Sequence, residues 1–73
     1  MKLNDVARAY VSAVELEERL TKEAPDLAED MSLLRADLHA LLMEALREND
    51  IPFVDRAAAA RIAFELVHQA TSR

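Results

Sequence analysis

The amino-acid sequence predicts an all-α protein, and three observations support this fold class. The chain contains no glycine, and its two prolines, Pro25 and Pro52, lie where helices are expected to begin. Alanine, leucine, glutamate and arginine, which all favour helices, dominate the composition. No segment alternates apolar and polar residues in the manner of a strand. We therefore expect residues 1–73 to form one domain, a three-helix antiparallel bundle.

The first helix is predicted over residues 5–23. We expect Asn4 or Asp5 to cap it, because short polar side chains accept hydrogen bonds from the free amides of the first turn. Its polar side carries glutamate, arginine and lysine at helical spacing, which indicates a solvated face. Its apolar residues recur at steps of three and four, apart from an interruption at Glu17: Leu3, Val6, Tyr10, Ala13 and Leu20.

The second helix, over residues 25–48, is the longest element, with Pro25 at its start and Asn49 in the left-handed conformation at its end. At about 1.5 Å per residue it is roughly 36 Å long. A compact protein of this size has a diameter of only about 29 Å. The predicted helix is longer than that, which indicates that it packs against a partner chain. Its apolar residues alternate in steps of four and three, the seam of a helix that packs lengthwise: Leu27, Met31, Leu34, Leu38, Leu41 and Ala45.

The third helix is predicted over residues 52–70, beginning near Pro52 or capped by Asp55. Its apolar residues form two stripes, one with Phe53, Ala57, Ala60, Phe64 and Val67, and another with Ala59, Ile62, Ala63, Leu66 and Ala70. A helix that is apolar on two sides lies between neighbours. Two helices can cover one stripe, so the other stripe predicts a second chain or an exposed interaction patch.

Composition limits the classes of partner. The net charge is −5, and the basic residues are scattered among a larger number of acidic ones, which disfavours direct nucleic-acid binding. No apolar run is long enough to span a membrane. The first residues turn acidic at Asp5, too early for a signal peptide, and there is no cysteine. We therefore expect a cytoplasmic protein with no membrane partner.

No residue pattern predicts catalysis, a metal or a cofactor. Glu65-x-x-His68 has the spacing of half a di-iron carboxylate site, but no second copy of it occurs in the chain. His39 and His68 are interpreted as structural residues rather than as a switch. Tyr10 is interpreted as a core residue, with an interface anchor as the alternative. Because the chain has no glycine, it lacks the phosphate-binding loop of nucleotide enzymes.

About half of the chain resembles the N-terminal region of the Mor family, the middle-operon transcription activators of Mu-like phages. The residues that carry this resemblance are the leucine-rich run Leu33–Leu42, then Leu46, Ile51-Pro52, and the segment Ala59–Leu66 with its alanines and isoleucine. In that family the region is the dimerisation module, and a DNA-reading helix-turn-helix follows it. The resemblance therefore implies dimerisation through the second and third helices and carries over no DNA-binding residue.

These observations predict a small acidic interaction module that binds another protein as a homodimer and acts as an inhibitor, anti-activator or adaptor. The alternative is a transcriptional regulator, built as a Mor-like dimerisation unit without its own helix-turn-helix. The predicted dimer or partner interface lies on the second and third helices and comprises Leu38, Leu42, Met43, Leu46, Ala59, Ile62, Phe64 and Leu66.

Overall fold

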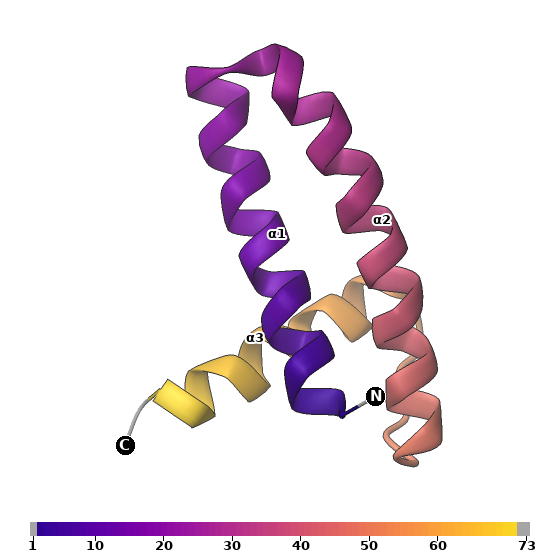
Figure 1. Ribbon diagram of the computed structural model, residues 1–73. Helices are drawn as coiled ribbons and strands as arrows, with labels where there is room; N and C mark the ends of the chain where they lie inside the picture. Colours follow the sequence, from indigo (N-terminus) through magenta and orange to yellow (C-terminus); the bar gives the residue numbers. More distant parts are fainter. Residues whose placement is uncertain (1, 72–73) are drawn as a thin grey trace.

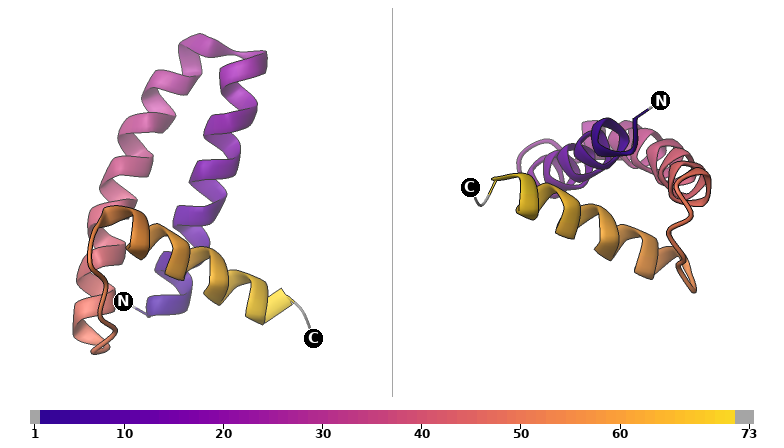
Figure 2. Two further views of the ribbon diagram at one scale, coloured as in Figure 1. Left: turned by 180° about the vertical axis from the view of Figure 1, so that it is seen from behind. Right: turned by 90° about the horizontal axis from the view of Figure 1, so that it is seen from below.

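The computed structural model describes residues 2–71 and consists of three helices, α1 (Leu3–Glu23), α2 (Pro25–Glu48) and α3 (Arg56–Thr71) (Figure 1). No strand occurs in residues 2–71, so the all-α fold class is confirmed. α1 and α2 form an antiparallel hairpin. α3 crosses the hairpin near the end where α1 begins and α2 finishes, and all of it lies on one side (Figure 2). The three helices pack together, but only α1 and α2 run antiparallel along their length.

A single residue, Ala24, connects α1 to α2. The Ala24 amide donates to the carbonyl of Leu20 at 2.7 Å, and the Ala24 carbonyl accepts from the Leu27 amide at 2.9 Å. Pro25 follows at the first position of α2, where its missing N–H leaves no hydrogen bond unmade. Because the connection is so short, the two helices must be antiparallel neighbours.

The end of α2 is closed by Asp50, not by Asn49 as the sequence suggested. Asp50 takes the left-handed conformation with φ 57°, whereas Asn49 has φ −99° and donates its side-chain Nδ2 to the Ala45 carbonyl at 2.8 Å. The Ile51 amide then donates to the Leu46 carbonyl at 2.9 Å. This is the pattern in which a left-handed residue lets the chain turn back and satisfy the last free carbonyls.

The start of α1 also corrects the sequence analysis, whereas the start of α3 confirms the second of its two predicted alternatives, the cap at Asp55. α3 begins at Arg56 rather than near Pro52, since the Asp55 Oδ1 accepts from the Ala58 amide at 2.8 Å and so caps the helix. α1 begins two residues earlier than expected. The amides of Asp5 and Val6 donate to the backbone carbonyl of Lys2. Asn4 and Asp5 therefore lie inside the first turn instead of capping it.

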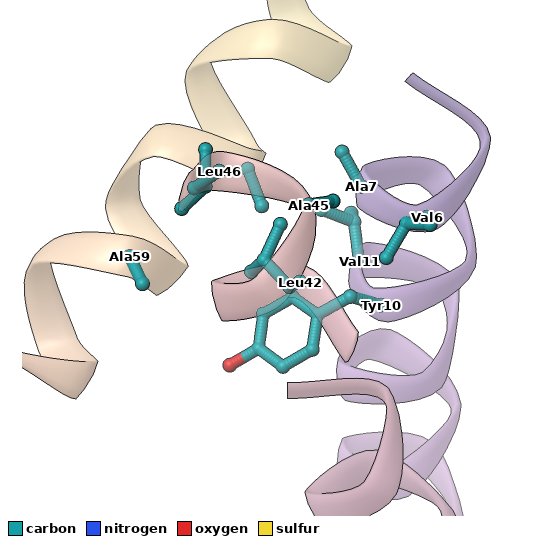
Figure 3. Close-up of a cluster of buried hydrophobic side chains, with 9 residues drawn as sticks. Val6, Ala7, Tyr10, Val11, Leu42, Ala45, Leu46 and Ala59 are labelled. Atoms are coloured by element: carbon teal, nitrogen blue, oxygen red, sulfur yellow. The ribbon is translucent and has the colours of Figure 1, made fainter. Parts of the chain in front are cut away.

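The core lies where the three helices meet (Figure 3). Small side chains on α3 let this helix cross the hairpin closely, because the distance between packed helix axes depends on the residues at the contact. The cluster of buried side chains consists of Val6, Ala7, Tyr10, Val11, Leu42, Ala45, Leu46, Ala59 and Ala63.

Burial is confined to this end of the hairpin. Residues 14–38, which include the far halves of α1 and α2, contain no buried side chain. The chain has an accessible surface of 5263 Å², whereas a compact protein of 8.2 kDa is expected to expose about 4,500 Å². Its radius of gyration is 12.6 Å and its longest dimension 37 Å, against a radius of about 11 Å for a compact chain of this length. The hairpin therefore extends beyond the part that α3 covers.

Leu42→Ala tests the position of the core. Leu42 is fully buried, and removing its side chain leaves a cavity, so we expect a loss of about 2–5 kcal/mol in the free energy of unfolding. The measurement is urea unfolding followed by circular dichroism. Leu33→Ala is the matched control, because Leu33 is 70% exposed and its truncation is expected to change stability by less than about 0.5 kcal/mol. Equal losses in the two variants would contradict this position of the core.

Candidate functional site

The structure divides the eight predicted interface residues into two groups. Leu42, Leu46 and Ala59 are fully buried inside the single chain, so they belong to the core and are not available as a surface. Their apolar character is explained by the packing of α1, α2 and α3 on one another. The other five are partly buried and pack against this core: Leu38, Met43, Ile62, Phe64 and Leu66.

The apolar seam predicted for α2 also lies differently from the expectation. The buried side chains of α2 are His39, Leu42, Ala45 and Leu46, so Ala45 is the one residue of the predicted seam that is buried. Leu27 and Leu34, predicted in the seam, are instead 55% and 48% exposed. The spacing of three and four residues identifies an apolar stripe, but it does not determine which of two adjacent stripes the rest of the chain covers.

Exposed leucines gather along the hairpin and form the candidate functional site. We call this surface the leucine face and define it as Leu16 of α1 with Leu27, Leu34 and Leu41 of α2. Leu16 and Leu41 are both 37% exposed. The three α2 residues are spaced seven apart, so they lie in one row along the helix.

Contacts of His39 show which side of the hairpin this row occupies. The His39 Nε2 lies 3.0 Å from the carbonyl oxygen of Arg56, the first residue of α3. Because a carbonyl can only accept, the Nε2 carries the proton and donates. His39 therefore faces α3, and Leu41, two residues later and about 200° further round the helix, points away from it.

Leu16 lies on the same side of the hairpin as Leu41. A hollow of about 200 Å³ is lined by Val6 of α1 together with Leu41, Glu44, Ala45 and Glu48 of α2, so this edge of α1 borders the side away from α3. Leu20 follows Val6 by about four helical turns, so the two residues lie on the same edge of α1. Leu16 lies one turn before Leu20 and therefore borders that edge too. The end-on view shows α1 and α2 in one layer and α3 in a second layer on one side only (Figure 2).

The opposite side of the outer hairpin is less apolar. Ala36 and Ser32 lie one and two turns before His39 in α2. They are on the same face of the helix as His39, the face that packs toward α3. Neither offers a large apolar side chain. Four of the exposed leucines therefore lie on the side that α3 does not cover, whereas Leu33, the most exposed at 70%, points away from them. An apolar surface of this kind is an interaction signature.

An ion pair holds the middle of the hairpin. The Arg35 Nε donates to both carboxylate oxygens of Glu17, at 2.9 and 2.8 Å, and the Arg35 Nη2 lies 3.4 Å from the Ser32 Oγ. Glu17 was the residue that interrupted the apolar rhythm of α1 in the sequence. It does so because it faces Arg35, so the two charges are joined between the helices beyond the apolar core.

Tyr10 connects the core to α3. Its ring lies 5.0 Å from the His39 ring and 6.5 Å from the Phe64 ring, the latter edge to face at 81°. Tyr10 is buried, which confirms its interpretation as a core residue, and His39 likewise has a structural position.

The loop between α2 and α3 borders a second hollow of about 650 Å³ that is open to solvent. The Arg47 Cζ lies 5.3 Å from the centre of the Phe53 ring, within the range of a cation–π contact. Val54 beside it is 93% exposed. This loop is separate from the leucine face.

The two residues of the predicted half metal site, Glu65 and His68, lie on α3. Within residues 2–71 there is no group of three or more histidine, aspartate or glutamate side chains placed to hold a metal ion, and Glu65 and His68 are both exposed. None of the three described helices has the length and apolarity needed to cross a bilayer.

Comparison with known proteins gives no family. No family model, no curated protein and no solved structure matches this chain. The resemblance to the Mor family thus stays a prediction.

A double-mutant cycle on Glu17 and Arg35 tests the hairpin contact. We expect Glu17→Gln and Arg35→Met each to lower the free energy of unfolding, and the double variant to lose less than their sum by about 1 kcal/mol. The reason is that either single change leaves a half-buried charge without its partner. Unfolding in urea measures all four chains, and strictly additive losses would show that the two charges do not interact.

Proposed function

We propose that this chain is a protein–protein interaction module that binds through the leucine face, acts as a homodimer, and serves as an inhibitor, anti-activator or adaptor. The observation that carries the proposal is the leucine face itself: four leucines, 37–55% exposed, lie on the side of the hairpin opposite α3. Monomeric proteins rarely leave contiguous apolar surface of this kind uncovered.

The size of the uncovered surface supports the same proposal. The chain as a whole exposes about 700 Å² more than a compact protein of its mass. Completing the burial of the four leucines contributes about 3–5 kcal/mol, given about 1.5–3 kcal/mol for a whole leucine side chain. A contact of this kind needs no catalytic group.

The mechanism that fits this surface is occupation. A partner whose apolar surface packs on the leucine face has that surface covered, which is how an inhibitor or anti-activator works. The loop with Phe53 and Val54 lies at the core end of the hairpin, outside the leucine face, and offers a second apolar contact. Two separate contact surfaces on one small chain are what an adaptor requires.

Leu34→Glu and Leu33→Glu test the proposal as a matched pair. The two leucines are neighbours in the sequence, but Leu33 points away from the leucine face and Leu34 belongs to it. A tagged chain is used for affinity capture from a lysate of the source cells, and the retained proteins are quantified by mass spectrometry. We expect Leu34→Glu to reduce the retained partner at least about tenfold, because a charge replaces a central apolar contact.

The control, Leu33→Glu, is expected to retain the partner as the unmodified chain does. Circular dichroism on both variants checks that the helical content is unchanged. If Leu33→Glu abolished capture while Leu34→Glu did not, binding would lie on the outer side of α2 and the leucine face would not be the site.

A further inference from the structure

The α2 edge of the leucine face is acidic along its whole length. Three carboxylates each follow a leucine of the face by three residues, so they form a row beside the leucines. A fourth lies one turn before this row, and a fifth continues the row of leucines seven residues after Leu41. All five are exposed, and in chain order they are Asp26, Asp30, Asp37, Glu44 and Glu48.

The α1 edge of the leucine face carries both signs of charge. Its carboxylates outnumber its arginines, so this edge does not offset the charge on α2. The charged residues of the α1 edge are Asp5, Glu15 and Glu23 together with Arg8 and Arg19. The surroundings of the four leucines are therefore negative on balance, and most of that charge lies on α2.

The arginines of α2 leave its acidic edge unpaired. Arg35 binds Glu17 on α1, and the Arg47 Cζ lies 5.3 Å from the centre of the Phe53 ring. Within residues 2–71, none of the five carboxylates on the α2 edge forms an ion pair. Their charge is thus available to a partner of opposite sign.

Two hollows adjoin Leu41, and each combines apolar side chains with carboxylates. The first, of about 200 Å³, lies between α1 and α2 and is lined in part by Glu44 and Glu48. The second, of about 500 Å³, is lined in part by Asp37 and Glu44, and Arg47 is its one basic residue. A lysine or arginine side chain suits such a hollow, because its apolar stem packs on apolar residues while its charged end reaches a carboxylate.

We propose that the occupant of the leucine face is a basic amphipathic helix of another protein. Its apolar side chains cover the four leucines, and its lysine or arginine side chains meet the carboxylates of α2. This inference rests on the proposed function, which makes the leucine face a protein-binding surface, and it names the class of partner. Leu27 and Leu41 are about 21 Å apart along α2, so about four turns of the partner helix lie in contact.

The helical form of the partner follows from the backbone of this chain. An extended segment binds by adding its main-chain hydrogen bonds to the edge of a sheet, and residues 2–71 contain no strand. A helix satisfies its own backbone hydrogen bonds and needs only an apolar surface to lie on. Leucines spaced seven apart are also the row that the apolar stripe of a helix matches.

Charge separates this occupant from the others. A second copy of this chain would bring the same acidic edges against one another, and like charges across an interface oppose association. Nucleic acid presents phosphates, which the same carboxylates repel. The homodimer of the proposed function is therefore expected to associate through a surface other than the leucine face.

The experiment uses two labelled helical peptides of about 18 residues, or five turns, that share one leucine stripe. The first has lysines on both sides of the stripe, and the second has glutamates at the same positions. Fluorescence anisotropy measures their binding to the unmodified chain at low salt. We expect the lysine peptide to bind at least about tenfold more tightly than the glutamate peptide, because only its charges are opposite to those of the face. Raising the salt to about 1 M shortens the screening length to about 3 Å and is expected to reduce this difference.

Two charge-reversed chains locate the binding site. Asp37→Arg with Glu44→Arg changes the acidic edge of the leucine face and is expected to weaken the lysine peptide at least about tenfold and to strengthen the glutamate peptide. The matched control, Glu18→Arg with Glu65→Arg, changes the total charge equally, but Glu18 lies on the opposite side of α1 from Leu16 and Glu65 lies on α3. We expect it to weaken the lysine peptide by less than about threefold, because salt screens distant exposed charges. Circular dichroism checks that both chains keep their helical content.

A lysine peptide that binds no better than the glutamate peptide would overturn the basic partner, and so would equal losses in the two charge-reversed chains. Absence of lysine-peptide binding across the micromolar range would overturn it too. The proposed function has a separate readout, since it requires a bound peptide or captured protein of either charge to be lost in Leu34→Glu and kept in Leu33→Glu. If that discrimination is found without a preference for lysine, the proposed function stands and the basic partner does not.

Discussion

Tyr10 and His39 hold α3 against the hairpin, and the position of this contact decides which end of the hairpin α3 covers. The His39 imidazole donates to the first carbonyl of α3, and the Tyr10 ring packs edge to face against Phe64. Both contacts lie in the half of the hairpin where α1 begins. α3 has 16 residues and is about 24 Å long, and it crosses a hairpin of about 36 Å instead of running along it. One crossing helix therefore covers one end and one side only.

The two ends of the hairpin are consequently held by different interactions. At the α3 end, leucine, valine and alanine side chains are buried among three helices. Beyond Ala13 no side chain is buried until His39, and the pair Glu17–Arg35 joins the helices there instead. Regions with few buried contacts are the ones that open most readily in folded proteins. The leucine face lies along this part of the hairpin, where the single chain has least apolar burial.

The sequence by itself determined the fold class, the three helices and their tight first connection, because glycine-free composition, apolar periodicity and Pro25 are local properties of the chain. It also determined that a helix of this length exceeds a compact monomer, as the 37 Å dimension shows. Only the tertiary structure decided which apolar stripe is covered. Leu42 and Leu46 are core residues and Leu34 is exposed, yet all three belong to overlapping stripes separated by a fraction of a turn. The choice depends on the angle at which α3 crosses, which follows from the loop at residues 49–55, the left-handed Asp50 and the cap at Asp55. These are long-range consequences of backbone geometry, and a periodic pattern of apolar residues does not contain them.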